Sequence, residues 1–144
     1  MSNLFLRHGE VQNEKDIFYS NLPGFYLSNN GREQAKDAGR KIKEQFDIKN
    51  IVSSPLLRAR QTAETVNSVL NINITISYNL IEWSGPNDWV GKTWEEIRST
   101  ENFKKANNNP LDLINTGETL KSVFDRFKYI YEKYEDTLFV SHQD

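Results

Sequence analysis

The two histidines of this 144-residue chain each follow a short apolar run, and one stands directly after an arginine. His8 lies in NLFLRHGE, between Arg7 and the pair Gly9-Glu10, and His142 follows TLFVS near the other end of the chain. Histidine can act as a covalent nucleophile, and a guanidinium group binds two phosphate oxygens at once. These residue types therefore indicate phosphoryl-group chemistry at a site built from both ends of the chain.

The middle of the chain supplies two more candidates for this chemistry. Arg58 lies in SSPLLRARQTA, in the first turns of a predicted helix, where the helix N-terminus also favours an anion. Glu82 follows the third predicted strand in SYNLIEWSG, and its carboxyl group could protonate a leaving alkoxide. The alternative is a metal site made of both histidines and a carboxylate, which the arginines disfavour because they repel a divalent cation.

A scaffold must bring these distant segments together, and the pattern of the chain predicts one. Short apolar runs predict strands over residues 3–7, 49–53, 73–77 and 137–140. Apolar periodicity predicts helices over residues 28–46, 54–70, 93–99 and 117–134. The alternation predicts an α/β fold with a mostly parallel sheet, and ligands bind beyond the carboxyl ends of such strands. Arg7, His8, Ser54 and His142 should therefore meet at one edge of the sheet.

Local signals place the helix starts and the least regular part of the chain. Ser28 is the predicted N-cap of the first helix, and Ser54 followed by Pro55 is predicted to cap the second. Residues 82–116 carry all three tryptophans, and we interpret them as an excursion near the active site. The length predicts a single domain over residues 1–144.

The composition excludes several function classes. The formal net charge is −2, whereas proteins that bind nucleic acid normally have a surplus of basic residues. Without cysteine there is no disulfide, thiolate metal site or cysteine nucleophile. No stretch is apolar enough for a signal peptide or a membrane span, so we expect a cytoplasmic protein without a membrane partner. The expected partner is a small phosphorylated metabolite. For the oligomeric state, both a monomer and a homodimer stay open.

Blocks along nearly the whole chain resemble the histidine phosphatase superfamily, the phosphoglycerate mutase-like proteins. They are RHGE at 7–10, LSNNGREQAKDAG at 27–39, IVSSPLLRARQTAETV at 51–66, NLIEWSGPNDWVGKTWEEI at 79–97, TGETLKSVFDRF at 116–127 and FVSHQ at 139–143. The blocks occur in the family's order. The resemblance implies a three-layer sandwich of helices around the sheet, and a phosphatase that hydrolyses phosphomonoesters through a phosphohistidine intermediate.

The same resemblance implies a role for each candidate. His8 would be the nucleophile that becomes phosphorylated, and Glu82 would be the proton donor and later the base for water. The phosphate-binding side chains would be Arg7, Arg58 and His142, and His142 would also be catalytic by stabilising the transferring group. Gly9 and Glu10 would support the nucleophile from outside the layer of residues that contact the substrate. No metal and no cofactor are implied.

The chain departs from the family pattern in two places that bear on its function. GFYLSNNG lacks the tryptophan and aspartate of mutase-type members, which favours a phosphatase over a phosphoglycerate mutase-type transfer. Family members usually continue past the second histidine with a helix and a strand, whereas this chain ends two residues after His142. We therefore expect it to lack those elements, either as a natural short form or as a truncated chain. A catalytically silent module that binds a phosphorylated ligand remains the third alternative.

Overall fold

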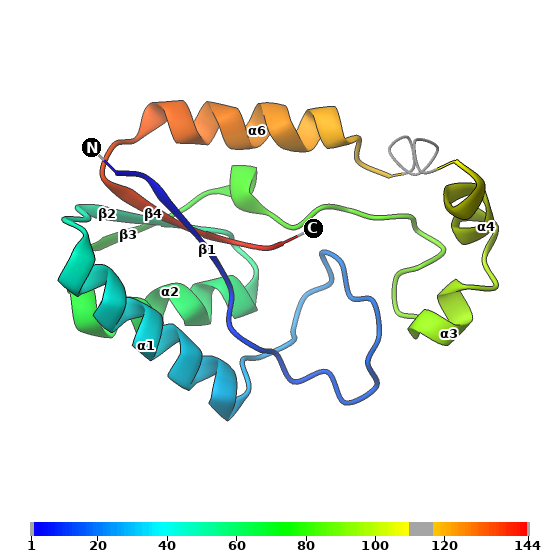
Figure 1. The fold of residues 1–144 in the computed structure, drawn as a ribbon, viewed down its shortest axis with the longest axis horizontal. Coiled ribbons are helices and arrows are strands. Elements are labelled where there is room, and N and C mark those ends of the chain that lie inside the picture. The colour runs from blue at the N-terminus through cyan, green and yellow to red at the C-terminus, as the bar shows by residue number, and fades with distance from the viewer. Residues whose placement is uncertain (1, 110–116, 144) are drawn as a thin grey trace. The chain divides into compact units, whose positions relative to one another are not determined.

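The computed structural model describes residues 2–109 and 117–143, and its described strands form one parallel sheet (Figure 1). The strands are β1 (Leu4–Arg7), β2 (Asn50–Ser53), β3 (Asn73–Ile76) and β4 (Thr137–Ser141), in the spatial order β1-β4-β2-β3. Each agrees with a predicted strand to within a residue at either end. The parallel register pairs Arg7 with Ser141 and Ser53 with Val140, so three strands end at the same level.

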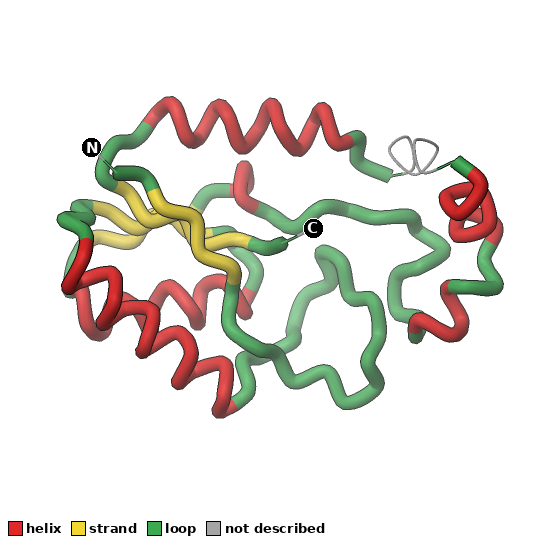
Figure 2. The backbone as a smooth tube through the Cα atoms, in the orientation of Figure 1, coloured by secondary structure: helices red, strands yellow, loops and turns green. Residues whose placement is uncertain are grey.

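Helices alternate with these strands along the chain (Figure 2). They are α1 (Asn29–Gln45), α2 (Leu57–Leu70), the 3-10 turn η1 (Tyr78–Leu80), α3 (Trp94–Ile97), α4 (Glu101–Asn108) and α6 (Leu120–Lys133). The α/β prediction is confirmed, and α4 was not predicted. Ser28 caps α1 by accepting a hydrogen bond from the Gly31 N–H, as predicted. In the part of the chain that the structure describes, no helix has the length and apolarity needed to cross a membrane.

The chain divides into two compact units. One contains the described residues up to Gln12, then Pro23–Glu82, and those from Arg126 onward, and it holds the sheet. The other contains Asn13–Leu22 and the described part of Trp83–Asp125. The single-domain organisation remains a prediction.

The sheet is covered on both faces, as expected for a parallel sheet. All five residues of β4 are buried. On one face, small residues of α1 and α2 pack against the sheet, and this core contains Ala35, Ile42, Ile51, Ala59, Ala63, Val66, Leu138 and Val140. On the other face, Ile130 of α6 joins Val52, Leu80 and Phe139. The sheet unit is therefore the predicted three-layer sandwich.

The predicted start of α2 is wrong. The helix begins at Leu57, three residues after Ser54, and its N-cap Leu56 provides no side-chain hydrogen bond. The reason is that the Ser54 N–H donates to the Val140 carbonyl at 2.9 Å, which keeps the backbone in the sheet through Ser54. The Ser54 hydroxyl is thereby left at the strand end instead of capping the helix.

The apolar residues whose periodicity predicts the last helix are only partly buried in α6. Ile130 is buried, whereas Phe124 and Tyr131 are exposed. The Tyr131 ring still packs on the sheet, with centroids 6.1 Å from Phe5 and 6.2 Å from Phe139.

Aromatic packing organises the second unit. The Trp89 ring lies edge-on to Phe18 and Trp94, with centroids 5.8 and 6.2 Å away, and Phe103 lies beside it. The Trp83 indole N–H donates to the Glu118 carbonyl at 2.7 Å. The three tryptophans of this unit are therefore packing residues.

Two glycines allow the loop after β1 to cross the first turn of α1 at very short range. A Cβ built on Gly9 would lie 2.4 Å from the Gly31 carbonyl oxygen, and one built on Gly31 would lie 2.1 Å from the Glu10 carbonyl oxygen. Atoms cannot approach so closely, and both obstacles are backbone atoms that no rotamer change can move. The position of His8 therefore depends on the absence of a side chain at Gly9 and Gly31.

We predict that Gly31→Ala lowers the free energy of unfolding, because the methyl group forces apart the loop after β1 and α1. The expected loss is about 1–3 kcal/mol, typical of overpacking, although alanine intrinsically favours a helix over glycine by about 1 kcal/mol. Urea denaturation followed by circular dichroism measures this. The control is Lys36→Ala on the exposed face of α1, which should change stability by less than about 0.5 kcal/mol. Equal stability of the Gly31→Ala variant and the parent would refute the proposed close contact.

Candidate active site

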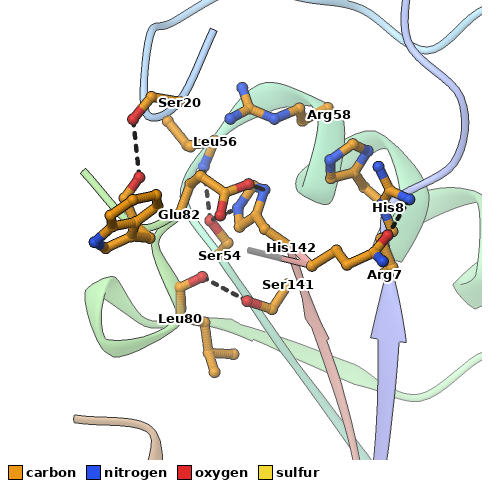
Figure 3. A network of polar contacts seen from close by, with 12 residues as sticks. Arg7, His8, Ser20, Ser54, Leu56, Arg58, Leu80, Glu82, Ser141 and His142 are labelled. Carbon is orange, nitrogen blue, oxygen red and sulfur yellow. Dashed lines mark hydrogen bonds and ion pairs between the residues drawn. The ribbon is translucent and has the colours of Figure 1, made fainter. Parts of the chain in front are cut away.

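The carboxyl ends of β1, β2 and β4 bring four of the sequence candidates together (Figure 3). Arg7 ends β1 and His8 follows it, while His142 follows β4 and Ser54 follows β2. The His8 N–H donates to the Ser141 carbonyl at 2.9 Å, which extends the ladder between β1 and β4 beyond its last pair. The two imidazole rings consequently lie with centroids 5.2 Å apart, at an angle of 63°.

A backbone contact fixes the tautomer of His8. Its Nδ1 lies 2.8 Å from the Gly9 carbonyl oxygen, which can only accept, so Nδ1 carries the proton. In the neutral ring, Nε2 therefore holds the lone pair. Burial is the main cause that lowers the pKa of His8 to about 4. Nearby His142, Arg58 and Arg7 act in the same direction, and the Gly9 hydrogen bond opposes them. His8 is thus a neutral imidazole with a nucleophilic Nε2 at neutral pH.

Thr62 connects the loop of His8 to the helix of Arg58. Its hydroxyl accepts from the Gly9 N–H at 3.0 Å and donates to the Arg58 carbonyl at 2.8 Å. Thr62 is one turn after Arg58 on α2, so both lie on the same helix face. The contact ties the residue next to the predicted nucleophile to the helix that carries a predicted phosphate ligand.

The two arginines of the site differ in environment. Arg58, in the first turn of α2, is the largest fully buried side chain among the described residues, with an exposed fraction of 0%. A guanidinium stays protonated even when buried, so it gives the site a permanent positive potential. Arg7 is exposed, and its Nη1 donates to the Gln143 side-chain oxygen. Arg60 is exposed on the surface.

Glu82 and Ser54 hold His142 between them. A Glu82 carboxylate oxygen lies 3.1 Å from Nδ1 of His142, and the Ser54 hydroxyl lies 2.8 Å from Nε2. The side chains of His142 and Glu82 are only 2% and 5% exposed. The sequence predicts that Glu82 follows the third strand at the carboxyl edge of the sheet. In the structure, the 3-10 turn η1 lies between β3 and Glu82.

Glu10 turns away from this group towards α1. Its carboxylate accepts hydrogen bonds from the Ser28 hydroxyl and the Asn30 amide, which lower the pKa of the exposed Glu10 carboxyl. Its backbone N–H donates to the Gln34 side chain at 3.0 Å. Glu10 therefore anchors the loop after β1 to the start of the helix.

Sequence reasoning missed the contacts of Ser54, Thr62 and Gln143. The sequence predicts Ser54 as a helix cap and assigns no role to Thr62 or Gln143. The only sequence signal for these contacts is the spacing of Thr62 from Arg58, since residues four positions apart on a helix lie on the same face. None of these contacts is local in sequence, except the one between Thr62 and Arg58.

The site combines an electron-pair donor with cationic hydrogen-bond donors and a carboxyl group. This set can bind a tetrahedral oxyanion, attack its centre and exchange a proton. His8, Glu82 and His142 also place one donor atom each within 4.8 Å of one another, so their geometry is compatible with a metal ion as well.

Comparison with known proteins places this geometry in a family. Residues 4–144 match the model of the histidine phosphatase superfamily (branch 1). The uncharacterized protein Rv0525 of Mycobacterium tuberculosis is 38% identical over 105 residues, which cover 65% of this chain and 52% of that protein. The 2,3-bisphosphoglycerate-dependent phosphoglycerate mutase of Thermoplasma acidophilum is 35% identical over 80 residues, which cover 55% of this chain and 40% of the mutase.

A solved structure agrees with this assignment. The phosphoserine phosphatase of Entamoeba histolytica, determined in complex with 3-phosphoglyceric acid, superposes with a TM-score of 0.77 at 27% identity, covering 98% of this chain and 73% of that one. The chain belongs to the histidine phosphatase superfamily, as its sequence blocks predicted. It spans about half the length of the Mycobacterium protein that it matches.

We predict that His8 titrates far below the ordinary range of histidine. NMR of the imidazole protons should show His8 with a midpoint near pH 4, far below the usual 6.5, because burial and nearby cations disfavour its charged form. His8→Ala assigns the signals, since only two histidines exist. The unfolded chain binds the proton first on acidification, so the stability from neutral His8 is complete above about pH 6.5 and is lost between about 6.5 and 4.

The size of this stability change follows from the shift. At 1.36 kcal/mol for each pKa unit, the loss should approach about 3 kcal/mol. Urea denaturation at a series of pH values measures it, and the His8→Ala variant should show a correspondingly flatter profile. A midpoint of His8 near 6.5 would contradict its burial in a cationic site.

Proposed function

We propose that the protein is a phosphatase that hydrolyses the phosphomonoester of a small metabolite through a phosphohistidine intermediate. The observation that carries the proposal is the fixed Nδ1–H tautomer of a buried, neutral His8 beside Arg58 and His142. A neutral imidazole is nucleophilic, and the buried guanidinium supplies the field that attracts the substrate anion. Membership of the family and the names of the matched proteins agree with phosphoryl chemistry.

In the first step, Nε2 of His8 attacks the phosphorus atom while the bond from phosphorus to the ester oxygen breaks. Arg7, Arg58 and His142 bind the phosphoryl oxygens and stabilise their charge in the transition state. Glu82, in its protonated form, gives its proton to the departing alkoxide. The products are the free alcohol, phosphohistidine at position 8 and a Glu82 carboxylate.

In the second step, water attacks the phosphohistidine. The Glu82 carboxylate removes a proton from the water as its oxygen bonds to phosphorus, and the bond between phosphorus and Nε2 breaks. Inorganic phosphate leaves, and both His8 and the Glu82 carboxyl return to their starting states. The contact between Glu82 and His142 supports this role, because it holds the carboxyl group at the edge where both histidines meet.

The mutase-type transfer is the second candidate, favoured by the match to the Thermoplasma mutase. Such an enzyme would return the phosphoryl group to a second hydroxyl instead of to water. We favour the phosphatase because GFYLSNNG lacks the tryptophan and aspartate expected of mutase-type members. A catalytically silent module that only binds a phosphorylated ligand would differ from both enzymes, because it would convert no phosphorylated substrate.

We predict that His8→Ala abolishes phosphate release, because no other described side chain at the site has the same nucleophilic nitrogen beside Arg58. Phosphate release from p-nitrophenyl phosphate and phosphorylated metabolites measures turnover, and acid-labile labelling measures the phosphoenzyme. Circular dichroism checks the fold, and Lys36→Ala is the surface control. Turnover by His8→Ala near the parent rate would contradict the nucleophile assignment.

We predict that Glu82→Gln discriminates between leaving groups. An alkyl phosphate departs as a strongly basic alkoxide, so loss of the acid should slow its cleavage by about 10²–10⁴-fold. A nitrophenyl phosphate departs as a stabilised phenolate, so its phosphorylation step should be much less affected. Phosphohistidine should then accumulate, because water has lost its base, and rapid-quench labelling detects it.

Three results would contradict this assignment. Equal slowing of both ester types without trapped phosphoenzyme would make Glu82 a structural carboxylate. No turnover by the parent despite vanadate binding would favour the silent module. Transfer to an added acceptor alcohol in preference to water would favour the mutase.

A further inference from the structure

The same edge of the sheet has the donor set of a transition-metal site. One donor atom from each of His8, Glu82 and His142 lies within 4.8 Å of the others, and all three side chains are largely buried. Two imidazoles and one carboxylate are ligands that suit Zn²⁺ and its neighbours rather than Mg²⁺ or Ca²⁺. The hydrolytic mechanism above uses these residues for other purposes and needs no metal.

The spacing of two of the donors is already close to that of a tetrahedral site. Nδ1 of His142 and Oε2 of Glu82 are 3.1 Å apart. Ligand atoms at ordinary Zn–N and Zn–O distances stand about 3.3 Å from one another around a tetrahedral ion. A cation can therefore bind between Nδ1 and the carboxylate without a large movement of either side chain.

Both imidazoles are held at their other nitrogen. Nδ1 of His8 is fixed by the Gly9 carbonyl, and Nε2 of His142 is fixed by the Ser54 hydroxyl, each at 2.8 Å. Such contacts orient the ring of a metal-binding histidine and select its tautomer. Nε2 of His8 and Nδ1 of His142 are thereby the nitrogens left for a cation.

Charge balance limits how such a cation would bind. Glu82 contributes one negative charge, whereas Arg58 and Arg7 repel a dication. The affinity should therefore be moderate, and a cation on Nε2 of His8 would occupy the electron pair that attacks phosphorus. These conditions describe a reversible inhibitor rather than a resident cofactor.

We propose that His8, Glu82 and His142 form a binding site for Zn²⁺-class cations, whose occupation blocks phosphoryl transfer by occupying the nucleophile. The binding part stands on the geometry alone, and the inhibition part rests on the proposed function. When the ion binds, Nδ1 of His142 and the Glu82 carboxyl group carry no proton, and the proton that Glu82 holds in the proposed catalytic cycle is released to solvent. Nε2 of His142 is then the protonated nitrogen of the ring and donates to the Ser54 hydroxyl.

Metal binding is measured without reference to activity. Zn²⁺ is titrated by calorimetry, and Co²⁺ is added to obtain the intense visible bands of a tetrahedral site. We expect one ion per chain, loss of binding in His8→Ala, His142→Ala and Glu82→Gln, and no binding of Mg²⁺. Ser54→Ala should weaken binding by about tenfold, because it removes the contact that orients His142. Glu44→Gln, an exposed carboxylate of α1, is the matched control and should bind like the parent.

Activity then tests the second part. Zn²⁺ should inhibit nitrophenyl phosphate hydrolysis by the parent, vanadate should compete with Zn²⁺ in the calorimeter, and chelator treatment should leave activity unchanged or raise it. Absence of Zn²⁺ and Co²⁺ binding, or binding that survives in well-folded His8→Ala, would overturn the metal site while leaving the phosphatase intact. Tight binding by a parent that hydrolyses no ester would instead overturn the proposed function and support the site.

Discussion

The parallel pairing of β1 with β4 is the constraint on which the site depends. Arg7 lies opposite Ser141 in this register, and one further hydrogen bond joins the His8 N–H to the Ser141 carbonyl. The two histidines therefore leave the sheet at the same level, although they come from opposite ends of the sequence. Side chains alternate between the faces of a strand, so a slip of one residue would direct one imidazole away from the other.

Close backbone contacts then fix what the register has brought together. Gly9 and Gly31 let the loop after β1 touch α1, and the hydroxyl of Thr62 joins that loop to α2. Neither contact concerns a group that reacts in the proposed mechanism. They determine, however, where Nε2 of His8 lies relative to Arg58, and a nucleophile must be held to within a fraction of an ångström.

Electrostatics gives the site two possible types of ligand. Arg58 and the neutral, buried His8 favour an anion with an electrophilic centre, which is the phosphoryl group of the proposed substrate. The imidazoles and Glu82 favour a cation, since each of the three offers an electron pair. Both ligands would require Nε2 of His8, so they exclude each other. The same geometry can therefore support catalysis and its inhibition.

The sequence by itself determined the order of the strands and of every described α-helix except α4, and the residue types of the site. Apolar runs and helical periodicity are local signals, and the RHGE and SSPLLRARQTA blocks are recognisable without coordinates. The local prediction was wrong at Ser54, because its N–H donates to the Val140 carbonyl in the sheet and the residue therefore does not cap α2. Only the tertiary structure decided that this hydroxyl meets His142, that Glu82 holds the other nitrogen of the ring, and that Thr62 joins the two halves of the site. Most of these contacts join residues far apart in the chain, and their partners are set by strand register and helix packing, which no short stretch of sequence encodes.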